Sequence, residues 1–234
     1  MGAPRSKIED IRISPSARVS DWKALHMGPT STNAAWKKAV KIFHDRIDAR
    51  FLAPVEAMRK HKEWAVREFC GFTVLAIDCL LIETLGQFYN GFNETPSMKE
   101  KDKALNPRGK RHHWFYAEFM KQMMSLSNAN GFDTRRKREL FYSHFRCGIL
   151  HQAQTKRKSR VVYKDKAEMV TSPEMVTFAD DSDQDQGLIV DRNQLHNALV
   201  VEVTSYENLL LSPQSQAHEL KRKNFITKMN FIAP

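Results

Sequence analysis

Apolar residues recur at helical spacing over four long stretches of the chain. They predict helices over residues 32–62, 64–89, 112–126 and 134–153, because side chains three and four positions apart share one face of a helix. Pro54 lies inside the first stretch, where it is expected to kink or divide the helix. The part of the chain up to residue 153 is therefore predicted to be mainly helical.

The stretch 64–89 is the most apolar of the four, with apolar side chains over most of its circumference. A helix of this kind belongs in the centre of a bundle. The pair Asn90-Gly91 is typical of a helix end. Residues 93–111 follow as a polar, lysine-rich connection with two prolines, which we expect to be exposed and mobile.

Beyond residue 158 the pattern changes from helical to strand-like. Three short segments predict β-strands: residues 160–164, 174–179 and 187–191. We interpret the region of about 158–191 as a small β insertion. Asp191 or Asn193 can then cap a last helix that runs to about Leu211.

The two ends of the chain lack a sustained apolar period. Residues 1–31 mix Pro, Ser, Arg and Gly and are interpreted as an N-terminal arm, and residues 212–234 as a basic C-terminal tail of marginal structure. Residues 32–211 between them are expected to form one mainly α domain, an up-down helical bundle with the β insertion before the last helix.

Size and charge add a class of partner to this picture. With 234 residues and 41% hydrophobic residues, the chain can bury one good core. Its 37 Lys and Arg against 27 Asp and Glu give a net charge of +10. Such a balance favours polyanionic partners, and nucleic acid first among them.

The cysteines and the longest apolar segment indicate where in the cell the protein is expected. The three cysteines are widely spaced and form no CxxC pair, so they predict neither a disulfide framework nor a zinc site and fit a reducing cytoplasm. Asp78 and Glu83 interrupt the most apolar segment before it reaches membrane-spanning length. We expect a soluble, cytoplasmic protein that does not enter a membrane.

The candidate chemistry lies in the fourth predicted helix, in the segment Arg146-Cys147-Gly148-Ile149-Leu150-His151. An arginine and a histidine separated by four residues on a late helix, behind a strongly apolar helix, resemble the HEPN superfamily over about residues 32–153. The resemblance implies a homodimer whose composite cleft cuts RNA without a metal ion and leaves a 2′,3′-cyclic phosphate. It also implies a role as a bacterial toxin or anti-phage effector, with an antitoxin or a defence-system protein as a further partner.

The two residue types suit this reaction for separate reasons. A histidine can exchange a proton near neutral pH, so His151 can take a proton from the 2′-hydroxyl or give one to the departing 5′-oxygen. The guanidinium of Arg146 stays charged and offers fixed donors to the phosphate. At Cys147 the superfamily often has Asn, Asp or His. No cofactor is expected, since the sequence has no Walker loop and no Rossmann fingerprint.

The spacing of the pair sets a geometric condition. Residues five apart on a regular helix point about 140° away from each other, so Arg146 and His151 cannot easily reach one phosphate from one straight helix. Either the helix is distorted near Gly148, or two copies of the motif face each other across a dimer axis. We favour the dimer.

Three further residues are candidates for supporting roles. Asp78 and Glu83 need partners if they are buried in an apolar helix, and Arg146 is an attractive one. Such a carboxylate either orients Arg146 or the attacking hydroxyl, or forms a purely structural ion pair. His144 lies about 10 Å along the helix from His151, too far to share a metal ion, and is expected at the surface or at an interface.

Basic residues flank the motif on both sides in the sequence. They are Arg135, Arg136, Lys137, Arg138, Lys156, Arg157, Lys158 and Arg160. They are candidates for a groove that follows RNA phosphates, with a solvated charged face as the plainer alternative.

These observations favour a HEPN ribonuclease. The alternative is a non-catalytic HEPN module that binds nucleic acid, nucleotide or a partner protein, and a third option is a purely structural helical protein.

Overall fold

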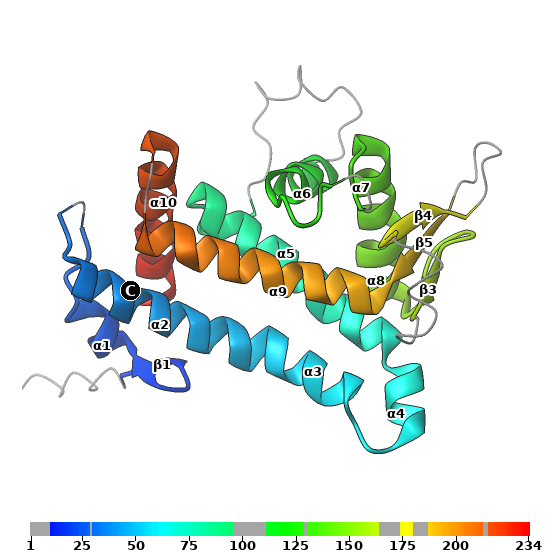
Figure 1. Cartoon of the computed structure of the whole chain (residues 1–234), viewed down its shortest axis with the longest axis horizontal. Coiled ribbons are helices and arrows are strands. Elements are labelled where there is room, and N and C mark those ends of the chain that lie inside the picture. The colour runs from blue at the N-terminus through cyan, green and yellow to red at the C-terminus, as the bar shows by residue number, and fades with distance from the viewer. Residues whose placement is uncertain are drawn as a thin grey trace, which may run out of the picture.

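The computed structural model describes residues 10–28, 30–95, 111–128, 131–163, 174–179, 187–212 and 215–234. Most of the connection expected to be mobile, residues 93–111, lies outside these ranges. The described chain is mainly helical, with two small sheets (Figure 1).

The first predicted helix is present and is divided near its proline. Helix α2 (Asn33–Ile47) continues through a π-helical turn, Asp48–Leu52, into α3 (Ala53–Arg59). The hydroxyl of Thr32 accepts the backbone N–H of Ala35 and caps the start. Pro54 stands in the first turn of α3, where its missing N–H costs least.

The most apolar stretch forms two helices, α4 (Trp64–Phe69) and α5 (Gly71–Asn90), which meet at Cys70. Helix α5 runs through the middle of the molecule, whereas α4 projects at the lower right of Figure 1. Gly91 ends α5 with a φ of 67°, a left-handed conformation that favours glycine. By length and apolarity alone α5 could cross a membrane, but half of that window is buried inside the protein.

The motif lies on one continuous helical rod. Helix α6 (Arg111–Gln122) precedes it, and the rod consists of α7 (Arg135–Phe141), a π-helical turn at Tyr142–Arg146 and α8 (Cys147–Gln152). The π-helical turn contains one of the two motif residues. The predicted helix over 134–153 is therefore confirmed, with a change of winding that the sequence pattern does not indicate.

The three predicted strands are also confirmed. They are β3 (Arg160–Val162), β4 (Val176–Phe178) and β5 (Leu188–Asp191). The central strand β5 pairs in parallel with β3 and antiparallel with β4. The carboxylate of Asp191 then accepts the backbone N–H groups of Asn193 and Gln194, so Asp191 is the cap of α9 (Arg192–Leu211).

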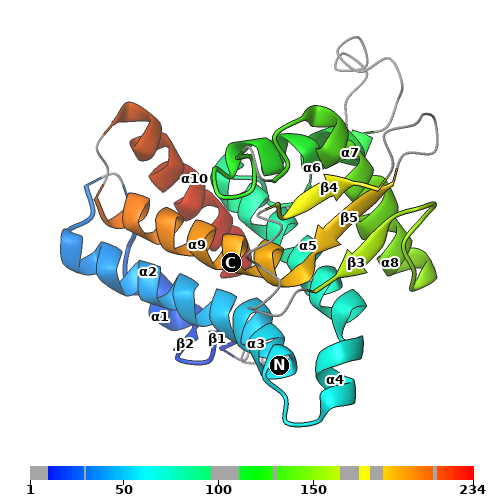
Figure 2. The ribbon, with the colours of Figure 1, turned by 45° about the vertical axis from the view of Figure 1, so that its right-hand side comes forward.

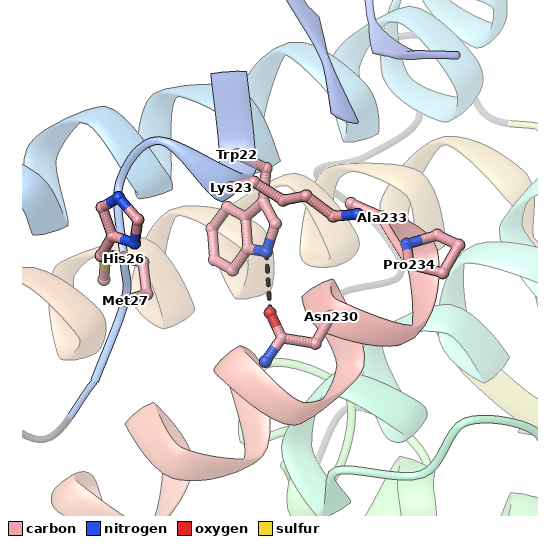
Figure 3. A pocket seen from close by; sticks show the side chains of 7 residues that line it. All are labelled: Trp22, Lys23, His26, Met27, Asn230, Ala233 and Pro234. Atoms are coloured by element: carbon pink, nitrogen blue, oxygen red, sulfur yellow. Dashed lines mark hydrogen bonds between the residues drawn. The ribbon is translucent and has the colours of Figure 1, made fainter. Parts of the chain in front are cut away.

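Both ends of the described chain are folded into the core. A small hairpin of β1 (Arg12–Ser14) and β2 (Ala17–Arg18) leads into α1 (Val19–Lys23), and the chain closes with α10 (Gln216–Ile232). The indole of Trp22, 2% exposed, donates to Asn230 on α10 at 2.8 Å (Figure 3).

The expected loose arm and marginal tail were therefore wrong for the described residues. The physical reason is that each end is held by few large side chains. Trp22 in a five-residue helix and Phe225 with Met229 in a mostly polar one are too sparse to produce a periodic signal. Their burial becomes visible only once the opposite ends of the chain meet.

Phe225 makes this C-terminal docking testable. Its ring is fully buried and contacts four other aromatic rings, those of Trp22, Trp36, Phe43 and Phe88. Phe225→Ala should lower the free energy of unfolding by about 3–5 kcal/mol, measured by urea denaturation, because it leaves a cavity in the core. Phe231→Ala, at a ring that is 45% exposed, is the matched control and should cost less than about 1 kcal/mol. Equal, small losses would show that α10 is not part of the core.

Candidate functional site

Arg146 is held against the central helix by one carboxylate. Its Nη2 donates to Oε2 of Glu83 on α5 at 3.2 Å, and its guanidinium lies 5.6 Å from the ring centre of Tyr142. Thr95 donates to the other oxygen of Glu83 at 2.5 Å. Burial lowers the pKa of Arg146, but Glu83, Tyr142 and Cys147 together outweigh it and the net shift is upward. Arg146 is thus a fixed cation.

One donor of this cation has no internal acceptor. The Nε–H of Arg146 is buried and makes no hydrogen bond to any part of the chain that the structure describes. Leaving a buried donor unpaired costs free energy, so such groups call for an explanation. The side chain as a whole is 23% exposed, so part of it is open to solvent although the Nε–H itself is buried.

His151 stands apart from Arg146 on the same rod. Helix α8 is regular between them, so the two side chains leave it in directions about 140° apart. Arg146 points to α5, whereas His151 is exposed to solvent. The π-helical turn ends at Arg146, before the interval that separates the pair, and does not bring them together.

Gly148 allows the segment after α8 to pass close to the helix, and it does not mark a bend in the helix. A Cβ at this position would come within 2.6 Å of the carbonyl oxygen of Gln154. The chain folds back closely here, and the backbone N–H of Lys156 donates to the carbonyl of His144 at 3.1 Å. Distortion near Gly148, one of the two geometries considered, is therefore not what this chain adopts.

His144 lies inside the protein, which corrects the expectation that it lies at the surface or at an interface. It is buried, and its Nδ1 shares a hydrogen bond of 2.9 Å with the hydroxyl of Ser159. That hydroxyl also accepts the backbone N–H of Leu188. His144 thereby connects the motif rod to the three-stranded sheet.

Two other residues of the rod surround the arginine. Cys147 is half-buried and is an electrostatic neighbour of Tyr142, which lies one turn earlier. Burial and this neighbour raise the pKa of Tyr142 to about 12, so the phenol is neutral at physiological pH. Tyr142 is a site residue that sequence reasoning missed as such, although it stands four positions before Arg146, one helical turn away.

Asp78 does not reach Arg146. It is fully buried and pairs with His196 of α9, with Oδ1 and Nδ1 2.8 Å apart. Of the two carboxylates in the apolar helix, Glu83 is therefore the partner of Arg146, and Asp78 joins two core helices. His196 was missed because it lies beside, not on, the apolar stripe that includes Leu195 and Leu199.

The basic residues around the motif divide into internal and exposed groups. Lys137 and Arg138 are buried and donate to backbone carbonyls of residues 131–133, so they close the turn before α7 and cannot join an exposed groove. Lys156 is half-buried. The exposed members are Arg135, Arg136, Arg157, Lys158 and Arg160.

The described residues contain no group of three or more His, Cys, Asp or Glu side chains placed to hold a metal ion. Comparison of the chain with models of protein families, with characterised proteins and with solved structures finds no match.

The buried pair generates a prediction about pH. Burial raises the pKa of Asp78 above that of an unfolded aspartate, against the opposing effect of His196. The fold thus favours the protonated acid, and this contribution to stability is present below about pH 4 and is lost as the pH rises through the raised pKa. Asp78→Asn should remove that loss, so its stability relative to the wild type should increase from pH 4 to pH 7 in urea titrations.

Asp133 is the control of opposite sign. Slight burial raises the pKa of Asp133, but Lys137 outweighs it and the net shift is downward. The stability that Asp133 contributes is present above about pH 4 and is lost as the pH falls through the lowered pKa, so Asp133→Asn should lose stability relative to the wild type as the pH rises from about 2 to about 4 and change little from pH 4 to pH 7. The same trend in both variants would contradict the assignment of Asp78.

Proposed function

We propose that this chain is a HEPN-type endoribonuclease that cuts RNA without a metal ion, acting as a bacterial toxin or anti-phage effector. The observation that carries the proposal is Arg146 itself. It is fixed by Glu83 but keeps a buried, unused donor, and an exposed histidine follows on the same rod.

The chemistry assigned to these residues is transfer within the RNA strand. The 2′-oxygen attacks the adjacent phosphorus as its proton is removed, and the bond from phosphorus to the 5′-oxygen breaks as that oxygen gains a proton. His151 serves these proton transfers because it is exposed and an imidazole can both accept and donate a proton. Arg146 stabilises the negative charge that accumulates on the phosphate oxygens.

The proposal requires two copies of the chain. Since Arg146 and His151 point in different directions within one copy, a site that contains both is best built at a two-fold axis, with each residue from a different subunit. The residues Arg157, Lys158 and Arg160 follow α8 in the sequence and are exposed, so they are the candidates for contacts with adjacent phosphates.

The alternative is a non-catalytic HEPN module that binds nucleic acid, nucleotide or a partner protein. The divergence of Arg146 and His151 within one chain favours it, as does the half-buried thiol of Cys147 at a position where the superfamily often has a polar residue. The two functions differ in one outcome, which is whether the RNA is cut.

Cleavage of single-stranded RNA by the purified protein in EDTA tests the proposal. The wild type should release fragments with 2′,3′-cyclic phosphate ends. His151→Ala and Arg146→Ala should each lower the rate by about 100-fold or more, because each removes a group that acts in the transition state. His112→Ala, at another exposed histidine, is the matched control and should cut at the wild-type rate.

The oligomeric state of each variant should be measured by light scattering in the same samples. Loss of activity with an intact dimer supports the assignment. Undiminished cutting in both motif variants would refute it, and RNA binding by a wild type that never cuts would select the non-catalytic alternative.

A further inference from the structure

A second site lies at the opposite end of α5 from its C-terminal glycine. A pocket of about 290 Å³ opens between α3, α4, the end of β3 and the start of α9. Figure 2 shows α4 projecting below β3, away from the helical bundle. Four of the side chains that line the pocket are cationic: Arg59, Lys60, Arg67 and Arg192.

A second pocket of about 460 Å³, lined by both apolar and polar side chains, adjoins the cationic one, and Glu68 is among its polar residues. Phe69 and Phe72 line one side, and Val161 and Val162 of β3 line the other. Tyr163 and Arg192 border both pockets, so the two share one wall.

Arg192 is the buried anchor of that wall. It is only 3% exposed, and its guanidinium donates to the backbone carbonyls of Arg67 and Glu68 and lies 4.4 Å from the ring centre of Tyr163. Its Nε–H is buried and meets no acceptor among the described residues. Gly71 makes room for this side chain, since a Cβ there would lie 3.2 Å from Nη1.

The charge of the cationic pocket is positive after its internal pairs are counted. Glu56 is its one acidic lining residue and pairs with Arg59 at 2.5 Å and Lys60 at 2.7 Å. Within the described residues, Arg67 donates to the backbone carbonyls of His61 and Lys62. Glu68 lines the adjoining pocket, so four cationic side chains face two carboxylates over both pockets. The excess charge is positive, which suits an anion.

Three aromatic side chains that line the two pockets are exposed to solvent and not packed in the core. Trp64 is 61% exposed, Phe69 75% and Phe72 41%, and the first two rings meet edge to face at 5.9 Å. Exposed aromatic groups of this size mark binding surfaces. Aromatic rings beside cations are the combination that binds nucleic-acid bases by stacking and phosphates by charge.

From this juxtaposition we propose that the paired pockets bind a nucleotide unit. Its base stacks on the aromatic side chains of α4 and α5, and its phosphate lies among the cations of α3, α4 and α9. The unit is either a free nucleotide or one residue of an RNA strand, and the second source rests on the proposed ribonuclease function. The two volumes together fall in the range that small ligands occupy.

Equilibrium binding separates these sources. The probes are AMP, UMP, inorganic phosphate and a fluorescent 12-residue 2′-O-methyl oligouridine, which lacks the 2′-hydroxyl and so cannot be cut. Lys60→Glu and Phe69→Ala change side chains that are 79% and 75% exposed and should not disturb folding. Each should raise the Kd of the bound probe by about tenfold. Lys38→Glu and Phe231→Ala are matched controls at exposed sites on α2 and α10 and should leave the Kd unchanged.

The results assign the source or overturn the proposal. Binding of AMP or UMP that competes with the oligonucleotide supports a nucleotide pocket, and binding of the oligonucleotide alone supports a strand contact. No binding of any probe, or binding that both pocket variants leave unchanged, overturns it. So does loss of the dimer in Phe69→Ala with an unchanged Kd, which would make the aromatic surface a subunit interface. Cleavage by the wild type is measured separately, so the failure of this site and of the nuclease are distinguishable.

Discussion

Two carboxylates in the most apolar helix determine how the rest of the protein is arranged around it. Helix α5 needs a buried position, but Asp78 and Glu83 need polar partners there. Each finds one on a different neighbour, Asp78 on α9 through His196 and Glu83 on the motif rod through Arg146. Removing one member of either pair would leave the other polar group without its partner in the interior, so both contacts specify which helices can pack on α5.

The pairing of Glu83 with Arg146 also determines the directions in which the two motif side chains point. With Arg146 tied to Glu83, the helical repeat sends His151 outward, so the protein carries a fixed cation and an exposed histidine on one rod. His144 and Ser159 connect this rod to the sheet, and the sheet leads directly into α9. The buried polar contacts thus form one connected frame around α5, and the motif is part of that frame.

Much of this fold follows from patterns within single segments. Apolar spacing predicts the main helices, and the alternation around residues 160, 176 and 188 predicts the strands. The features that these patterns do not predict depend on contacts between distant segments. Trp22 and Phe225 meet only after the ends of the chain come together. Lys137 and Arg138 look like a surface charge cluster until the turn before them folds onto their side chains.

The residues of the candidate site could also be predicted only in part. The resemblance names Arg146 and His151, and the need of a buried carboxylate for a partner suggests Glu83. The sequence does not distinguish Asp78 from Glu83, because both lie in the same apolar helix and only the packing of α9 assigns His196 to one of them. The basic and aromatic lining of the second pocket escapes notice because its residues come from four separate stretches of the chain.

The central claim is that one active site combines Arg146 from one subunit with His151 from its partner. Mixing the inactive Arg146→Ala and His151→Ala proteins under subunit exchange tests it directly, because each mixed dimer would contain one intact pair. The account predicts recovery of about a quarter of the wild-type cleavage rate, since about half of the dimers are mixed and each has one of two sites. A mixture as inactive as its two components, with exchange demonstrated by differential labelling, would contradict it.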